Sequence, residues 1–215
     1  MKVTIKQEVF KKFPQLRVGF VITEGIDNKS KIAKANHLLA DMQKVVLLTF
    51  NKDTIKSHHL ISPWDAARAE FGKKAKHYHT SVEVLLKKVL SKKNIKTKDT
   101  VTTLLHYLAL KHIVPFGADD TAKLKGDITF ELKKGDLCYR DGKKVLGQKL
   151  DYWKNATTAV RPTSTSALLH FEFLPPFNPA KEREILTEAF ELVAMFCGGK
   201  VKVEVLDKKR NSVEL

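Results

Sequence analysis

The sequence predicts an α+β protein with a mixed or antiparallel sheet and packed helices. Helical patterns crowd the first half of the chain, whereas strand patterns that resemble hairpins dominate the second half. Helices and strands that are segregated in this way are typical of α+β folds, whereas regular alternation would indicate a doubly wound parallel sheet. The chain has 215 residues and shows neither an internal repeat nor a clear linker, so we expect residues 1–215 to form a single domain.

In the first third of the chain, residues 16–23 (LRVGFVIT) form the clearest strand pattern, and residues 2–10 also alternate between apolar and polar side chains. Residues 30–50 repeat apolar side chains at helical spacing. A second helix is expected over residues 62–72, because Ser62 suits the cap and the proline after it suits the first turn.

Two further helices are predicted next. Thr80-Ser81-Val82-Glu83 has the pattern of a capping box, which predicts a helix over residues 81–90. Another helix is expected over residues 100–112 and cannot continue through Pro115. We expect a Gly-Ala-Asp-Asp turn at residues 117–120, directly after this proline.

The rest of the chain predicts mostly strands. The turn Arg140-Asp141-Gly142 indicates a hairpin between two short strands, and Gly198-Gly199 indicates the end of a helix. The expected strands cover residues 127–132, 137–139, 144–146, 166–174 and 201–205, and the expected helix covers residues 179–196.

The net charge of +15 is the most unusual property of the composition. Such a charge attracts polyanions and accelerates encounter with them. Between Gly72 and Lys98 the chain has nine lysines and one acid, Glu83. Few aromatic side chains interleave with these lysines, so they favour contact with the phosphates of a folded RNA over base stacking, and a solvated lysine face is the alternative. The predicted RNA-binding residues are Lys73, Lys74, Lys76, Lys87, Lys88, Lys92 and Lys93.

Several classes of function lack their signatures. Cys138 and Cys197 stand far apart without a CxxC partner, which argues against a disulfide framework and fits a reducing compartment. The paired histidines lack clustered carboxylates, so we predict no metal and no cofactor. The N-terminal residues lack the apolar run of a signal peptide, and no segment is apolar enough to span a membrane. We therefore expect a cytoplasmic protein without a membrane partner.

The segment KDTVTTLLHYLALKHIVPFGADD contains the candidate site. Gly117 and Ala118 leave room for a ligand to approach the backbone. His106 lies among leucines in the expected helix, either as a pocket wall or as a hydrogen-bonded core residue. Asp119 and Asp120 are candidates for catalysis, or else they cap the next turn.

Blocks of this sequence, taken in order, resemble stand-alone B3/B4 domain proteins, relatives of a module in the β subunit of phenylalanyl-tRNA synthetase. The blocks are FPQLRVGFVITEGIDN, SPWDAARAEFGKKAKHYHTSVEVLLKKVL, LLHYLALKHIVPFGADDTAKLKGDITF, DYWKN and TSALLHFEFL. The similarity as a whole covers about residues 13–205. In the synthetase this module hydrolyses the ester of tRNA mischarged with tyrosine. The resemblance implies a B3/B4-like fold, a pocket sized for an amino acid and tRNA or aminoacyl-tRNA as the partner.

The sequence departs from the synthetase pattern at the expected pocket. Leu105-His106 stands where the synthetase has Thr-Asn, and in its Pro-x-His-Ala turn only Pro115 and Ala118 remain, with Gly117 in place of the histidine. A tryptophan common in the stand-alone relatives corresponds to Trp153. The predicted substrate-binding residues are therefore Leu105, His106, Pro115, Gly117, Ala118, Trp153 and Thr157, and the catalytic candidates are His106, Asp119 and Asp120. Two hypotheses follow: deacylation of mischarged aminoacyl-tRNA in trans, and a non-catalytic RNA-binding or amino-acid-sensing module.

Overall fold

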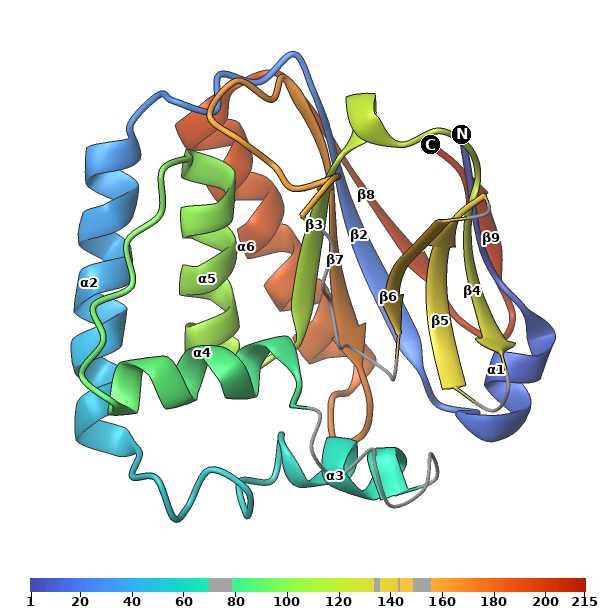
Figure 1. Ribbon diagram of the computed structural model, residues 1–215, viewed down its shortest axis with the longest axis horizontal. Helices are drawn as coiled ribbons and strands as arrows, with labels where there is room; N and C mark the ends of the chain where they lie inside the picture. The colour runs from blue at the N-terminus through green and yellow to red at the C-terminus, as the bar shows by residue number, and fades with distance from the viewer. Residues whose placement is uncertain (70–78, 134–135, 143, 149–155) are drawn as a thin grey trace.

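The computed structural model describes residues 1–69, 79–133, 136–142, 144–148 and 156–215. Figure 1 shows three layers: a helical layer, a sheet in the middle that we call the central sheet, and a second sheet that we call the outer sheet. Helices and sheets of this kind confirm the predicted α+β class. Among the described residues, no helix combines the length and the apolar character needed to cross a membrane.

The central sheet has the strand order β3-β7-β2-β8, and each neighbouring pair is antiparallel. Its strands are β3 (Phe116–Asp120), β7 (Ser166–Phe173), β2 (Arg17–Glu24) and β8 (Lys200–Leu206). One face is covered by the helical layer, which contains α2 (Ile32–Thr49), α4 (Ser81–Leu90), α5 (Thr100–His112) and α6 (Pro179–Cys197). Because this sheet lies between two layers, β2 and β7 are buried on both faces, which explains their nearly continuous apolar sequences.

The outer sheet is mixed and has the strand order β6-β5-β4-β1-β9. Its strands are β6 (Lys144–Gln148), β5 (Asp136–Asp141), β4 (Ile128–Lys133), β1 (Lys2–Ile5) and β9 (Ser212–Glu214). Strands β1 and β4 are parallel, whereas the other pairs are antiparallel. The space between the sheets is filled by an apolar core that also includes Trp64 of α3 (Ser62–Ala69) and Phe10 of α1 (Gln7–Lys12).

The two faces of β7 define the position of the candidate site. Leu169 and Phe171 point into the core shared with α5 and α6, whereas Leu168 points into the core between the sheets. Successive side chains of a strand point to opposite faces. His170 and Glu172 therefore lie on the same face as Leu168, toward the outer sheet.

Several predicted elements are confirmed within one or two residues, and the capping box at Thr80 and Glu83 has both of its hydrogen bonds. The predicted turn at residues 117–120 is wrong, because these residues belong to β3 and their backbone pairs with β7. The alternating pattern of residues 2–10 also does not correspond to one strand, since β1 ends at Ile5 and α1 follows. Strand β9 was not predicted.

Candidate functional site between the two sheets

Polar side chains gather on the face of β3 and β7 that is turned toward the outer sheet. Thr158 Oγ1 donates a hydrogen bond to Asp119 Oδ1. His170 Nδ1 contacts Glu172 Oε1 on the same strand, and the ring centre of Tyr139, on β5, lies 5.7 Å from that of His170. We call these five residues the inter-sheet cluster. All of them are buried, with His170 at 0% and Asp119 at 1% exposure.

Gly117 lies in the middle of this cluster. It pairs with His170 across the two strands, while Asp119 pairs with Leu168. Gly117 and Asp119 are two residues apart on one strand and so share a face. Because glycine has no side chain, β3 places none directly opposite the imidazole of His170. Gly117 therefore borders the candidate site.

Burial sets the protonation of the cluster. It lowers the pKa of His170 to about 3, so the imidazole is neutral at pH 7. It also raises the pKa of Asp119, and the Thr158 hydrogen bond, the nearby His170 and the Tyr139 hydroxyl offset this only in part. The phenol pKa of Tyr139 is raised well above its usual value, mainly by burial, so this side chain stays protonated.

The arrangement can move protons and recognise a cation. When Glu172 is ionised it can only accept a hydrogen bond, so its contact with Nδ1 then requires the proton of His170 on Nδ1 and leaves the lone pair on Nε2. A general base works best when its pKa lies near the working pH, so the buried His170, with a pKa of about 3, can activate water effectively only once the packing around it opens and its pKa rises toward the ordinary value of 6.5. The carboxyl groups of Asp119 and Glu172 are suited to an ammonium group.

The structure does not bring His106 and Asp119 together. His106 lies on α5, and its ring meets the ring of Phe116 at 5.4 Å in an edge-on contact. Phe116 belongs to the cores on the helical side, so His106 and Asp119 lie on opposite faces of the central sheet. Burial, with a smaller contribution from Lys88, lowers the pKa of His106 to about 4.

The other predicted binding residues do not all lie at the inter-sheet cluster. Leu105 and Ala118 pack into the core on the helical side, away from the cluster. The carbonyl oxygen of Pro115 accepts a hydrogen bond of 3.2 Å from the backbone of Glu172, which ties this proline to the strand of the cluster. Trp153 lies outside the described residues.

Asp120 and Thr157 each have a local partner of their own. Asp120 caps the short 3-10 helix η2 (Thr121–Lys123), because its Oδ1 accepts from the backbone N–H of Ala122 at 3.1 Å. Ser164 also donates to its Oδ2, at 2.6 Å. These contacts support the capping interpretation for Asp120. Thr157 is exposed and contacts Lys144, whereas its neighbour Thr158 reaches Asp119.

Four residues of the cluster were not predicted: Tyr139, Thr158, His170 and Glu172. The signal for two of them is present in the strand sequence SALLHFEF, where His170 and Glu172 are the polar residues of an apolar run and are spaced by two. Such spacing places both on one face of a strand. Tyr139 and Thr158 have no comparable local pattern.

The described part of the lysine-rich segment lies on and after α4. Lys88, Lys92 and Lys93 are exposed. Lys87 is half-buried, its Nζ lies 2.9 Å from His79 Nε2, and burial lowers its pKa. Lys73, Lys74 and Lys76 lie outside the described residues.

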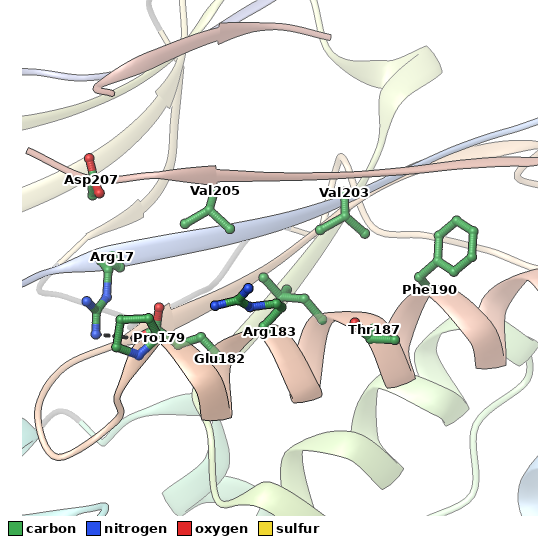
Figure 2. Close-up of a pocket in the computed structure, with 10 residues that line it drawn as sticks. Arg17, Pro179, Glu182, Arg183, Thr187, Phe190, Val203, Val205 and Asp207 are labelled. Carbon is green, nitrogen blue, oxygen red and sulfur yellow. Dashed lines mark ion pairs between the residues drawn. The ribbon is translucent and has the colours of Figure 1, made fainter. Parts of the chain in front are cut away.

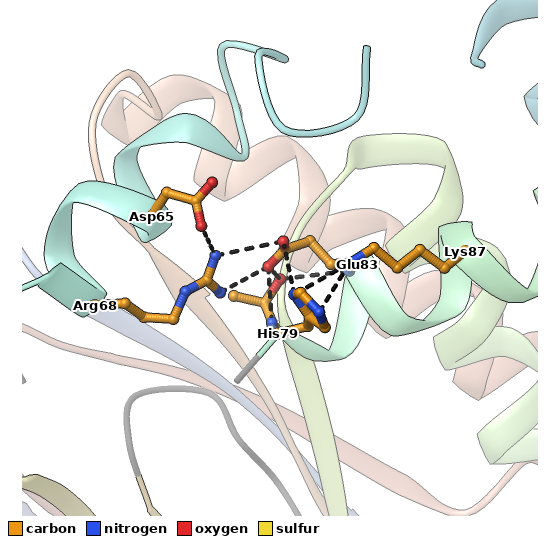
Figure 3. A network of polar contacts seen from close by, with 6 residues as sticks. Asp65, Arg68, His79, Glu83 and Lys87 are labelled. Atoms are coloured by element: carbon orange, nitrogen blue, oxygen red, sulfur yellow. Dashed lines mark hydrogen bonds and ion pairs between the residues drawn. The ribbon is translucent and has the colours of Figure 1, made fainter. Parts of the chain in front are cut away.

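Glu83, the single acid of that segment, is turned inward (Figure 3). Its side chain is fully buried, and its Oε2 lies 2.7 Å from Arg68 Nη1, which comes from α3. Arg68 also contacts Asp65, and the backbone N–H of Thr80 donates to Glu83 at 2.8 Å. The charge of Glu83 is thus paired within the protein. The exposed lysines after it are not neutralised by this acid.

Within the described residues, no group of three or more histidine, cysteine, aspartate and glutamate side chains is placed to hold a metal ion. Comparison with known proteins yields no matching family model and no matching curated protein.

Proposed function

We propose that this protein binds tRNA through the exposed lysines of α4 and the residues after it, and hydrolyses the ester of a mischarged aminoacyl-tRNA at the inter-sheet cluster. The observation that carries this proposal is the burial of a neutral imidazole, His170, next to two carboxyl groups on one face of β3 and β7. The resemblance to stand-alone B3/B4 domain proteins, relatives of the editing module of phenylalanyl-tRNA synthetase, supports the same function.

The chemistry of an aminoacyl ester suits this cluster. The free α-ammonium group of the amino acid would be held by Asp119 and Glu172, since carboxylates are strong partners for ammonium donors. His170 Nε2 would take a proton from water as the water attacks the ester carbonyl carbon. The bond between that carbon and the ribose oxygen then breaks, and the proton passes to the ribose oxygen. Holding the water and the ester together supplies much of the rate.

The charge distribution supports RNA as the partner. The chain carries a net charge of +15. Lys56 is close enough to Lys87 to lower the pKa of the latter, so the loop after α2 adds positive charge beside α4. A dense cationic surface binds phosphates and contributes most of the affinity for RNA at low salt.

A second candidate function is a binding module without catalysis. His170 and Asp119 are 0% and 1% exposed, so an ester can reach them only if the packing around the cluster opens. Binding of RNA to the exposed lysines of α4 requires no such opening, which favours a module that binds RNA without hydrolysis.

The test is to incubate the protein with a panel of radiolabelled aminoacyl-tRNAs and to follow ester loss alongside tRNA binding. The proposed function predicts that at least one member of the panel loses its amino acid faster than the spontaneous rate. Measurable tRNA binding without ester loss for every member would contradict hydrolysis and support the binding module.

A further inference from the structure

Strand β8 forms one edge of the central sheet. In the described part of the chain it pairs with β2 alone, through the register Val18–Leu206 to Glu24–Lys200. The outer side of an edge strand presents backbone N–H and C=O groups that can pair with another strand. This edge is therefore a candidate surface for strand addition.

An apolar groove runs beside this edge (Figure 2). It has a volume of about 330 Å³ and lies between β8 and α6. Val203 and Val205 line it from the strand, and Leu186 and Phe190 line it from the helix. Phe190 is 39% exposed, which leaves a large apolar side chain uncovered. As far as the described residues go, the edge therefore combines backbone groups without a strand partner with apolar surface.

The sequence of β8, KVKVEVL, is complementary to itself when two copies run antiparallel. In a pairing centred on Val203, Lys202 of one copy lies opposite Glu204 of the other, and Val201 lies opposite Val205. The Nζ of Lys202 and the Oε1 of Glu204 are already 2.9 Å apart within one chain, so both charges lie on the same face of the strand. Opposite charges in directly facing positions stabilise antiparallel pairs.

We propose that two copies of this chain form a dimer in which their β8 edges pair antiparallel about a two-fold axis at Val203. The four strands of each central sheet then join into one continuous sheet of eight. Val203 lies across the groove from Phe190 (Figure 2), so the same axis brings the two Phe190 side chains toward each other. The second copy thus covers both the open edge and the apolar groove. This inference does not depend on the proposed function.

Lysines on an edge strand are also a common protection against strand pairing. Under that alternative the protein stays monomeric, and reversing one charge of β8 has no effect on its mass in solution. Charge reversal at Lys202 and Glu204 therefore separates the two interpretations.

The experiment measures self-association of the full chain by sedimentation velocity at several concentrations, and of mixtures by native mass spectrometry. In the proposed dimer, position 202 of each copy faces position 204 of the other. The Lys202→Glu variant therefore places two glutamates opposite each other at both sites, and the Glu204→Lys variant places two lysines opposite each other. We expect each substitution to raise the dissociation constant of the dimer about ten-fold, because two cross-strand pairs become repulsive. An equimolar mixture of the two variants should instead form heterodimers, because every facing pair is then Glu with Lys.

The mixture also controls for local damage. Glu204 contacts Arg210 at 2.6 Å within the chain, and Glu204→Lys removes this contact in the homodimer and the heterodimer alike. As a matched control, Lys181→Glu and Glu184→Lys reverse an exposed ion pair on α6 and should leave the dimer unchanged. A monomeric wild type, or single variants that dimerise as strongly as the wild type, would overturn the proposal. A mixture with no more heterodimer than random pairing of the two variants gives would also overturn it.

Discussion

Arg68 and Glu83 form an ion pair with 2.7 Å between Nη1 and Oε2, and their side chains are 3% and 0% exposed. The pair joins α3 to the start of α4 (Figure 3). It thereby holds α4, the helix that carries Lys87 and Lys88, two of the predicted RNA-binding lysines.

Removing Glu83 leaves the buried Arg68 with the partly exposed Asp65 as its remaining carboxylate partner in the network, which is destabilising and places the effect at the lower end for buried pairs. We expect Glu83→Gln to lower the free energy of unfolding by about 3 kcal/mol, as measured by urea denaturation. Glu184→Gln is the matched control, because Glu184 pairs with Lys181 at an exposed site and should cost less than about 1 kcal/mol. Equal effects of the two substitutions would contradict a buried role for Glu83.

The same pair predicts a dependence of stability on pH. Burial alone would raise the pKa of Glu83, but Arg68 and the donors of Thr80 outweigh burial and hold the pKa below its ordinary value of 4.5. The contribution of Glu83 is therefore complete above about pH 5 and is lost as the pH falls below the unfolded value. The stability difference between wild type and Glu83→Gln should shrink as the pH falls from 6 to 3. A constant difference would contradict the lowered pKa.

The raised pKa of Asp119 predicts the opposite dependence of stability on pH. Burial raises its pKa, so the ionised carboxylate costs stability at neutral pH and the cost disappears as the pH falls toward the unfolded pKa. Asp119→Asn keeps an acceptor for Thr158 and removes the charge. We expect it to raise the thermal midpoint at pH 7 and to have little effect at pH 3. A variant that is less stable than wild type at pH 7 would show that the charged carboxylate is stabilising.

The exposed lysines predict a dependence of tRNA binding on salt. Reversing Lys88, Lys92 and Lys93 to glutamate should weaken binding strongly at low salt, and each lost phosphate contact should reduce the slope of log K against log salt by about 0.7–0.9. Lys87 is left unchanged because it packs against His79. The control reverses the exposed lysines at positions 200, 208 and 209, with the same change in net charge. An equal loss in both variants would mean that total charge, rather than the α4 surface, determines binding.

Much of the fold was predictable because its signals are local. Strand β2 is buried on both faces and reads as one apolar run, and the capping box of Thr80 and Glu83 marks a helix start by itself. Strand β3 was missed because Gly117, Asp119 and Asp120 are residue types that rarely favour strands. Only pairing with β7, which is distant in sequence, makes these residues extended.

The candidate site could be predicted only in part, because only some of its residues are marked by local sequence. Asp119 and Gly117 can be named from their local sequence; Asp119 belongs to the cluster, and Gly117 pairs with its His170. The position of His106 among leucines predicts a buried side chain, but helical spacing does not show which face of the sheet that helix covers. His170 lies in a strand whose apolar character dominates the pattern. That Thr158 rather than Thr157 reaches Asp119 depends on the tertiary structure alone.

In the proposed function His170, and not His106, acts on the aminoacyl ester. The direct measurement is single-turnover deacylation of the most reactive aminoacyl-tRNA by wild type, His170→Gln and His106→Gln, with tRNA binding measured for each. We predict that His170→Gln loses at least about 100-fold in rate with tRNA binding intact, because a general base contributes about 10²–10⁴. His106→Gln should retain most of the activity. Full activity in His170→Gln, or a selective loss in His106→Gln, would contradict the account.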